Sequence, residues 1–154
     1  MNKRDGRPGG ADPAGQDDRP GFPRRDAEGR VVALGDLLGV ALAGVVVGVL
    51  ALVVFDWTFE LLGSGDFGQA NGWLAVILPA WLFWEDFRAW EFGPARVVAA
   101  LVAVGAGVAA GLLVAGVAAG LAPLLSGGLA AATFTVVYAV VWFAGVRWLV
   151  RRTG

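Results

Sequence analysis

Two acidic residues near the end of the first apolar segment have a spacing that could support chemistry. Asp56 and Glu60 are four residues apart, so on a helix they share one face. No lysine or arginine occurs between Arg30 and Arg88, so these carboxylates and the nearby Asp66 have no basic partner in the local sequence. Closely spaced acids without basic partners can bind a cation or share a proton. The pair is therefore a candidate for an ion pathway, and the alternative is an ordinary hydrated loop.

Asp36 is the third ion-pathway candidate, because it lies within an otherwise continuous apolar segment. A charge at the centre of a membrane helix costs about 2.5–3.5 kcal/mol on insertion scales, and far less near an end. Asp36 is close to the start of its segment, where a carboxylate interacts favourably with the helix dipole. Two interpretations stay open: an ion-coupling carboxylate that faces the cytoplasm, or a first-turn charge with no part in transport.

The composition excludes most enzyme chemistry. The sequence has no cysteine and no histidine, which removes thiolate nucleophiles, disulfides, the commonest general base and the commonest transition-metal ligand. The sequence contains no nucleophile–base pair, phosphate-binding loop or metal-ligand spacing. No basic patch is interleaved with stacking aromatic residues, so nucleic acid is not an expected partner. We therefore expect a protein that is not an enzyme, with no cofactor and no metal site.

The elements that carry these residues are apolar helices. Of the 154 residues, 57% are hydrophobic and the mean hydropathy is +0.67, above the range of soluble domains. The apolar residues form blocks after residue 30, which predicts an all-α integral membrane protein. We expect a four-transmembrane-helix bundle over residues 31–154 with a disordered N-terminal tail. The predicted helices cover residues 31–62, 69–92, 95–121 and 129–150, with a turn at 122–128.

The second of these segments has the weakest membrane signal. Its strictly apolar run from Trp73 to Trp84 reaches only roughly 18 Å on a helix, and it contains Pro79. The hydrocarbon layer is about 30 Å thick, so this run crosses it only together with its more polar flanks. A spanning helix is the preferred interpretation, because it keeps Arg88 and Arg96 on the cytoplasmic side. A re-entrant or interfacial element is the alternative.

The positive charges predict the orientation. All 12 Lys and Arg residues lie before the first apolar segment, between the second and third, or at the end of the fourth. Basic residues are retained in the cytoplasm during insertion, so we expect a multi-pass protein of the cell membrane with both termini cytoplasmic. Aromatic and basic residues at the cytoplasmic interface are expected to anchor the helices there: Trp84, Trp90, Arg96, Arg147, Trp148, Arg151 and Arg152.

Residues 1–30 are predicted to be a disordered cytoplasmic tail. They are rich in proline, glycine and charges of both signs, and Phe22 is their one large apolar residue besides Met1. Such a segment does not bury enough surface to offset the entropy of ordering.

Small residues at four-residue spacing predict helix-packing faces. In lipid, helices associate through close backbone approach at such positions rather than through a hydrophobic driving force. For the third segment the spacing leaves two partners open: the first segment of the same chain, or the third segment of another copy. The expected packing residues are Gly35, Gly39, Ala43, Ala103, Gly107, Gly111, Ala115 and Ala119, with Gly44 and Gly48 on a separate face of the first segment.

The expected function follows from these faces and from the missing chemistry. We expect a non-enzymatic accessory or assembly subunit whose partners are the lipid bilayer and either further copies of itself or another membrane protein. The alternative is a small oligomeric channel or transporter for a cation or proton, with Asp36, Asp56 and Glu60 along the path.

Overall fold

The computed structural model describes residues 21–91 and 93–153, and their regular elements are all helical. The prediction of an all-α protein is therefore confirmed. The elements are α1 (Leu34–Leu61), the 3-10 helix η1 (Gly72–Val76), α2 (Ile77–Ala89), α3 (Pro94–Val117) and α4 (Pro123–Thr153).

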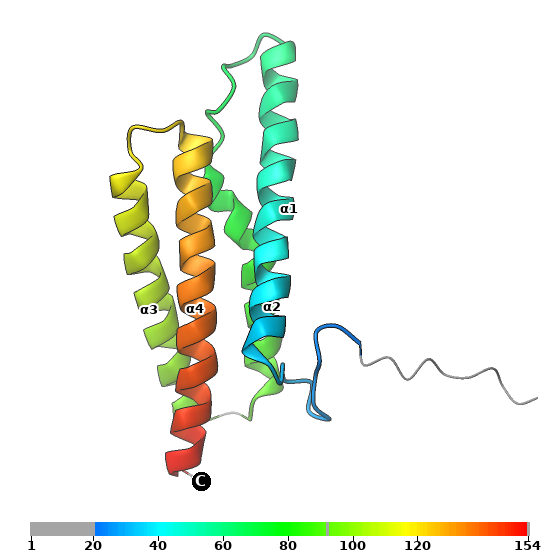
Figure 1. Ribbon diagram of the computed structural model, residues 1–154, viewed down its shortest axis with the longest axis vertical. Coiled ribbons are helices and arrows are strands. Elements are labelled where there is room, and N and C mark those ends of the chain that lie inside the picture. Colours follow the sequence, from blue (N-terminus) through cyan, green and yellow to red (C-terminus); the bar gives the residue numbers. More distant parts are fainter. Residues whose placement is uncertain (1–20, 92, 154) are drawn as a thin grey trace, which may run out of the picture.

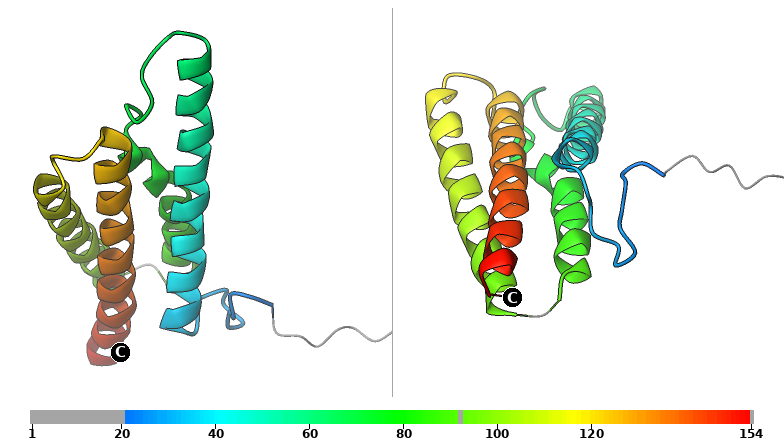
Figure 2. Two further views of the ribbon diagram at one scale, coloured as in Figure 1. Left: turned by 45° about the horizontal axis from the view of Figure 1, so that its top comes forward. Right: turned by 60° about the horizontal axis from the view of Figure 1, so that its bottom comes forward.

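The chain runs back and forth between the two ends of the bundle (Figure 1). The start of α1, the end of α2, the start of α3 and the end of α4 lie at one end, which we call the arginine end. The opposite end, called here the outer end, holds the connection from α1 to η1 and the turn between α3 and α4. Helix α4 occupies the middle, packing on α3 along one side and on η1 and α1 along the other (Figure 2).

Three helices are long and apolar enough to cross a membrane: α1, α3 and α4. Most residues in their apolar stretches are not buried inside the bundle, as expected where lipid replaces water as the neighbour. The chain therefore has the helices of a membrane protein.

The second predicted helix is shorter than the sequence indicated and is not one of these three. Residues 62–71 form a loop, Asn71 caps η1 by accepting a hydrogen bond from the Trp73 amide, and α2 begins only at Ile77. Pro79 explains this division. It lacks an N–H group and is accommodated in the first turn of α2, where that donor has no helical partner anyway.

The fourth helix begins at Pro123 rather than at Leu129, because proline is well suited to a first helical turn. Residues 122–128 were predicted to be a turn, and nearly all of them belong to α4 instead. The real turn lies between Val117 and Pro123. The glycines that favoured a turn are used for close packing, since Gly127 and Gly128 lie directly against Gly72 of η1.

Of the tail that was predicted to be disordered, residues 1–20 lie outside the described part of the chain, and residues 21–30 lie within it. Residues 24–32, called here the N-terminal turn, fold back on themselves through a bridge between Arg25 and Val31. This segment contains few apolar residues, but it is held by hydrogen bonds to α1, α2 and α4, which composition alone does not reveal.

The core has two differently packed halves. Toward the arginine end, aromatic rings of α2 and α4 fill the space between these helices, with Phe83 stacked on Tyr138 and Phe87 tilted against Trp142. Toward the outer end, small residues allow backbones to approach, and Val45, Ala75 and Ala131 form a compact second cluster.

Candidate functional site

The arginines of the described residues gather at the arginine end. Arg88 and Arg96 flank the connection from α2 to α3, and Arg147 lies in the last turns of α4. The others there are Arg24, Arg25, Arg30, Arg151 and Arg152.

Asp86 is the carboxylate at the centre of this end. It is 3% exposed, and it accepts hydrogen bonds from the Trp142 indole Nε1 at 2.7 Å and the Val31 amide at 3.0 Å. The residue lies in the last turn of α2, where a negative charge opposes the helix dipole. The two hydrogen bonds compensate for that placement, and they join the N-terminal turn to α2 and α4.

Arg147 of α4 binds the backbone at Val31 and Val32, beside the amide that bonds to Asp86. Its Nη2 donates to the carbonyls of Val31 at 2.9 Å and Val32 at 3.2 Å, and its guanidinium lies 3.7 Å from the centre of the Phe143 ring. The Val31 N–H therefore donates a hydrogen bond to α2, and the Val31 carbonyl accepts one from α4. The entry of α1 is fixed in position by both helices.

Ion pairs within the N-terminal turn shape it further. Arg30 donates to Asp26 at 2.7 Å and to Glu28 at 2.7 Å, and its guanidinium lies 5.0 Å from the centre of the Trp90 ring. The hydrogen bond from Arg30 to the Asp26 carboxylate raises the pKa of Arg30. Partial burial opposes the charge on Asp26, but the hydrogen bonds from Arg30 prevail and lower the pKa of Asp26.

Asp36, one of the three ion-pathway candidates, forms an ion pair with Arg24. It accepts from the Arg24 backbone amide at 2.9 Å and from the Arg24 guanidinium at 2.8 and 3.2 Å. The side-chain hydrogen bond to Asp36 raises the pKa of Arg24. The carboxylate thus ties the N-terminal turn to the first turn of α1.

Asp56 and Glu60, the other two candidates, lie at the outer end. Asp56 is buried and accepts a hydrogen bond from the Gly68 amide, whose carbonyl in turn accepts from the Leu124 amide. Gly68 has a φ of +92°, a conformation that strongly favours glycine. Glu60 is exposed whereas Asp56 is buried. The two carboxylates therefore have different surroundings, although they are four residues apart on the same helix.

The three candidate acids lie at the two ends of α1. Asp36 and Asp56 are separated along α1 by roughly 30 Å, and the packed side chains of Leu37, Ala41 and Val45 lie between them. Among the residues that the structure describes, no group of three or more acids is placed to hold a metal ion.

The small-residue face of α3 packs within the chain. Ala103 is fully buried, a side chain at Gly107 would meet the Phe134 ring, and one at Gly111 would meet Trp73 of η1. Within the chain, the partners of this face are thus α4 and η1 rather than the first helix. Ala115 is half-buried, and Ala119 lies beyond the end of α3 and is exposed.

The two faces of α1 differ. Gly48 lies against Ala75 of η1 and Gly44 against Pro79 of α2, so this face packs within the chain. Gly35, Gly39 and Ala43 are exposed, and a Cβ at Gly39 would lie 3.3 Å from the Phe22 ring.

The chain matches no protein-family model, and no curated protein or solved structure is significantly similar to it. The interpretation of the site therefore rests on its own geometry.

The predicted interface anchors have two kinds of contact. Arg96 donates to the carbonyls of Phe87 and Trp90 and so closes the end of α2, and Arg147 bonds the N-terminal turn. Trp84 is exposed, and Arg152 stacks on Trp148 at 4.4 Å.

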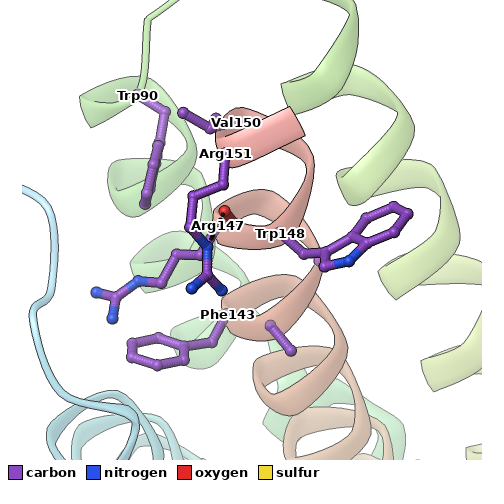
Figure 3. Close-up of a pocket in the computed structure, with 8 residues that line it drawn as sticks. Trp90, Phe143, Arg147, Trp148, Val150 and Arg151 are labelled. Carbon is purple, nitrogen blue, oxygen red and sulfur yellow. Dashed lines mark hydrogen bonds between the residues drawn. The ribbon is translucent and has the colours of Figure 1, made fainter. Parts of the chain in front are cut away.

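Trp90, Arg147, Trp148 and Arg151 also line an open pocket of about 920 Å³ (Figure 3). Arginine and tryptophan at a membrane surface interact favourably with anionic and interfacial lipid groups. The pocket therefore fits the anchoring role expected of these residues.

Asp86 is the residue that sequence reasoning missed as a site. The sequence places it in a charged, aromatic stretch that also contains Glu85 and Glu91. Two signals were present: an acid near the end of a helix opposes the dipole, and Trp142 lies in an apolar run where its indole N–H needs an acceptor.

Proposed function

We propose that this chain is a non-enzymatic accessory or assembly subunit of the cell membrane that works in contact with another membrane protein or with copies of itself. The outer end of α1 is the observation that carries this proposal. Helix α1 continues past the ends of α3 and α4 (Figures 1 and 2). On this projecting part Trp57 is 55% exposed, Leu61 67% and Leu62 71%. A cluster of exposed apolar side chains typically marks an interaction surface.

The rest of the structure supports a packing role better than a transport role. The carboxylates Asp36 and Asp56 are both engaged in hydrogen bonds at opposite ends of α1, and the core between them is filled. A cation or proton channel remains the alternative function, and it would depend on the exposed Glu60 and on Asp56 beside it.

The proposal includes four crossings with both termini in the cytoplasm. The 3-10 helix η1 rises about 2 Å per residue and α2 about 1.5 Å, so together they extend roughly 30 Å, which is the thickness of the hydrocarbon layer. The described arginines all lie at the end that this proposal assigns to the cytoplasm.

Cysteine cross-linking tests the packing role directly, because the chain has no native cysteine. In native membranes, oxidation of a Leu61→Cys variant is expected to give a covalent dimer or an adduct with one membrane protein. The matched control is Leu113→Cys, which is equally exposed but lies on the outward face of α3. Equal cross-linking at both positions would contradict a specific surface on α1.

Flux measurement separates the two functions. Purified protein in liposomes is expected to conduct neither protons nor monovalent cations above the level of empty liposomes. A flux that disappears in the double variant Asp56→Asn, Glu60→Gln would replace the subunit proposal with the channel.

Cysteine labelling tests the four crossings. Single variants Ser64→Cys, Gly93→Cys and Gly120→Cys place the label in each connection, at positions where the glycines have open space around them. With an impermeant maleimide on intact cells, we expect labelling at 64 and 120, and at 93 only after permeabilisation. Labelling at 64 and 93 without 120 would mean that η1 and α2 turn back within the membrane.

A further inference from the structure

The open pocket at the arginine end combines two positive side chains with an apolar lining. It has a volume of about 920 Å³ and is bordered by the last turns of α4 and by Trp90 at the end of α2. Arg147 and Arg151 extend from α4 into the space on the side of Trp90 (Figure 3). Of the described residues that line the pocket, none is acidic. The remaining lining is apolar or aromatic: Phe143, Ala144, Gly145, Trp148 and Val150.

Both guanidinium groups keep donors that the described chain does not use. Arg147 donates to Val31 and Val32 through Nη2, which leaves its Nε and Nη1 without a partner among the described residues. Arg151 donates through Nε to the Arg147 carbonyl at 3.1 Å, and its terminal nitrogens Nη1 and Nη2 have no partner in the same part of the chain. The two terminal nitrogens of a guanidinium form a fork that matches two oxygens of a phosphate group.

The charge of this pair is not neutralised by the described chain. Arg147 and Arg151 are four residues apart on one helix, where like charges destabilise each other, and neither forms an ion pair with a described carboxylate. An anion bound between the two guanidinium groups removes this repulsion. The carboxylates that pack at this end have other partners: Asp26 and Glu28 bind Arg30, and Asp86 binds Trp142 and the Val31 amide.

The lining indicates that the anion carries an apolar part. The pocket is far larger than one phosphate group, and a phosphate alone would leave most of its apolar lining in water. An anionic phospholipid brings a phosphodiester and acyl chains in one molecule. A zwitterionic phospholipid has the same phosphodiester but adds an ammonium group, which the two guanidinium groups repel.

We propose that this pocket binds one anionic phospholipid through its phosphodiester group. The phosphate lies between the guanidinium groups of Arg147 and Arg151, and the acyl chains leave along the apolar lining into the bilayer. The inference rests on the part of the proposed function that places the arginine end at a membrane surface. It does not depend on the packing surface of α1.

Native mass spectrometry of the full chain, released from detergent micelles, tests this proposal with dioleoylphosphatidylglycerol as the probe. The measurement counts the lipid molecules on each protein and gives their affinity. We expect one phosphatidylglycerol to bind at least about tenfold more tightly than dioleoylphosphatidylcholine, which has the same chains and phosphodiester but no net charge. Equal affinity for the two lipids would overturn the proposal.

A pair of matched variants locates the site. Arg151→Gln removes the fork and is expected to weaken phosphatidylglycerol binding about tenfold, the effect of losing charge-assisted hydrogen bonds. Arg152→Gln removes the same charge from the next residue, which does not line the pocket, and is expected to keep the native affinity. Both side chains are exposed, so both variants are expected to fold. An unchanged affinity in Arg151→Gln, or an equal loss in Arg152→Gln, would contradict a defined site.

Competition by inorganic phosphate separates a lipid from a soluble anion. An excess of phosphate is expected to leave phosphatidylglycerol bound, because only the lipid also gains from the apolar lining. Complete displacement would overturn the lipid as the ligand and assign the pocket to a soluble phosphate compound. The cross-linking of α1 is measured separately, so a failure here is distinguishable from a failure of the packing role.

Discussion

The Asp86→Ala variant is expected to lose about 2–6 kcal/mol of unfolding free energy. Its carboxylate accepts from two buried donors, the Trp142 indole and the Val31 amide, and each buried donor left without a partner costs about 1–3 kcal/mol. The loss also releases the N-terminal turn from α2. Denaturation with sodium dodecyl sulfate in mixed micelles, followed by tryptophan fluorescence, measures the change.

Glu85→Ala is the matched control for this prediction. Glu85 is the neighbouring acid on the same helix, but it is exposed and its removal is expected to change stability by less than about 0.5 kcal/mol. In the double variant Asp86→Ala, Trp142→Phe, the two losses are expected to be less than additive, because the indole donor is then no longer left unsatisfied. Equal stability of Asp86→Ala and Glu85→Ala would show that the buried carboxylate does not hold the arginine end together.

The Gly72→Ala variant is expected to be the second most damaging change. A Cβ at this position would lie 2.2 Å from the Leu124 carbonyl oxygen and 2.3 Å from the Gly128 amide nitrogen. Both obstacles are backbone atoms of α4, so no side chain can rotate away. Overpacking of this kind costs about 1–3 kcal/mol, and we expect the upper end because η1 must separate from α4.

Gly105→Ala controls for the general effect of replacing a membrane glycine. Gly105 lies in the interior of α3 with no atom near its Cβ position, so alanine is expected to stabilise the helix by up to about 1 kcal/mol. The same denaturation assay compares the two variants. If Gly72→Ala were as stable as Gly105→Ala, the close contact between η1 and α4 would not exist in the membrane.

The parts of the fold that were predictable are those that depend on local apolar composition. Helices α1 and α3 have long runs of valine, leucine, alanine and glycine, and such runs specify membrane helices without reference to the rest of the chain. The segment that forms η1 and α2 was harder to predict. Its apolar run is short, and because it contains Pro79 it folds as a 3-10 helix followed by an α-helix. The start of α4 was misplaced because glycines near Pro123 are as typical of turns as of close helix packing.

The candidate site was less predictable because its contacts join distant parts of the chain. The Val31 amide and Asp86 are 55 residues apart in the sequence, and Asp86 and Trp142 are 56 apart. Periodicity reports which face of a helix is apolar, but it does not report which donor on one helix meets which acceptor on another. Asp36 shows the same limit, since its partner Arg24 belongs to a segment whose composition predicted disorder.

The position of Arg147 has a consequence for biosynthesis. During translation α1 is made before α4, yet the carbonyls of Val31 and Val32 at the start of α1 receive their hydrogen bonds from Arg147 of α4. Nascent chains that stop before Trp142 can form α1, α2 and α3 but lack both side chains of α4 that join this end. The hydrogen bonds between the N-terminal turn and α4 can therefore form only after α4 has been synthesised, so protection of this turn from proteases would report the docking of α4.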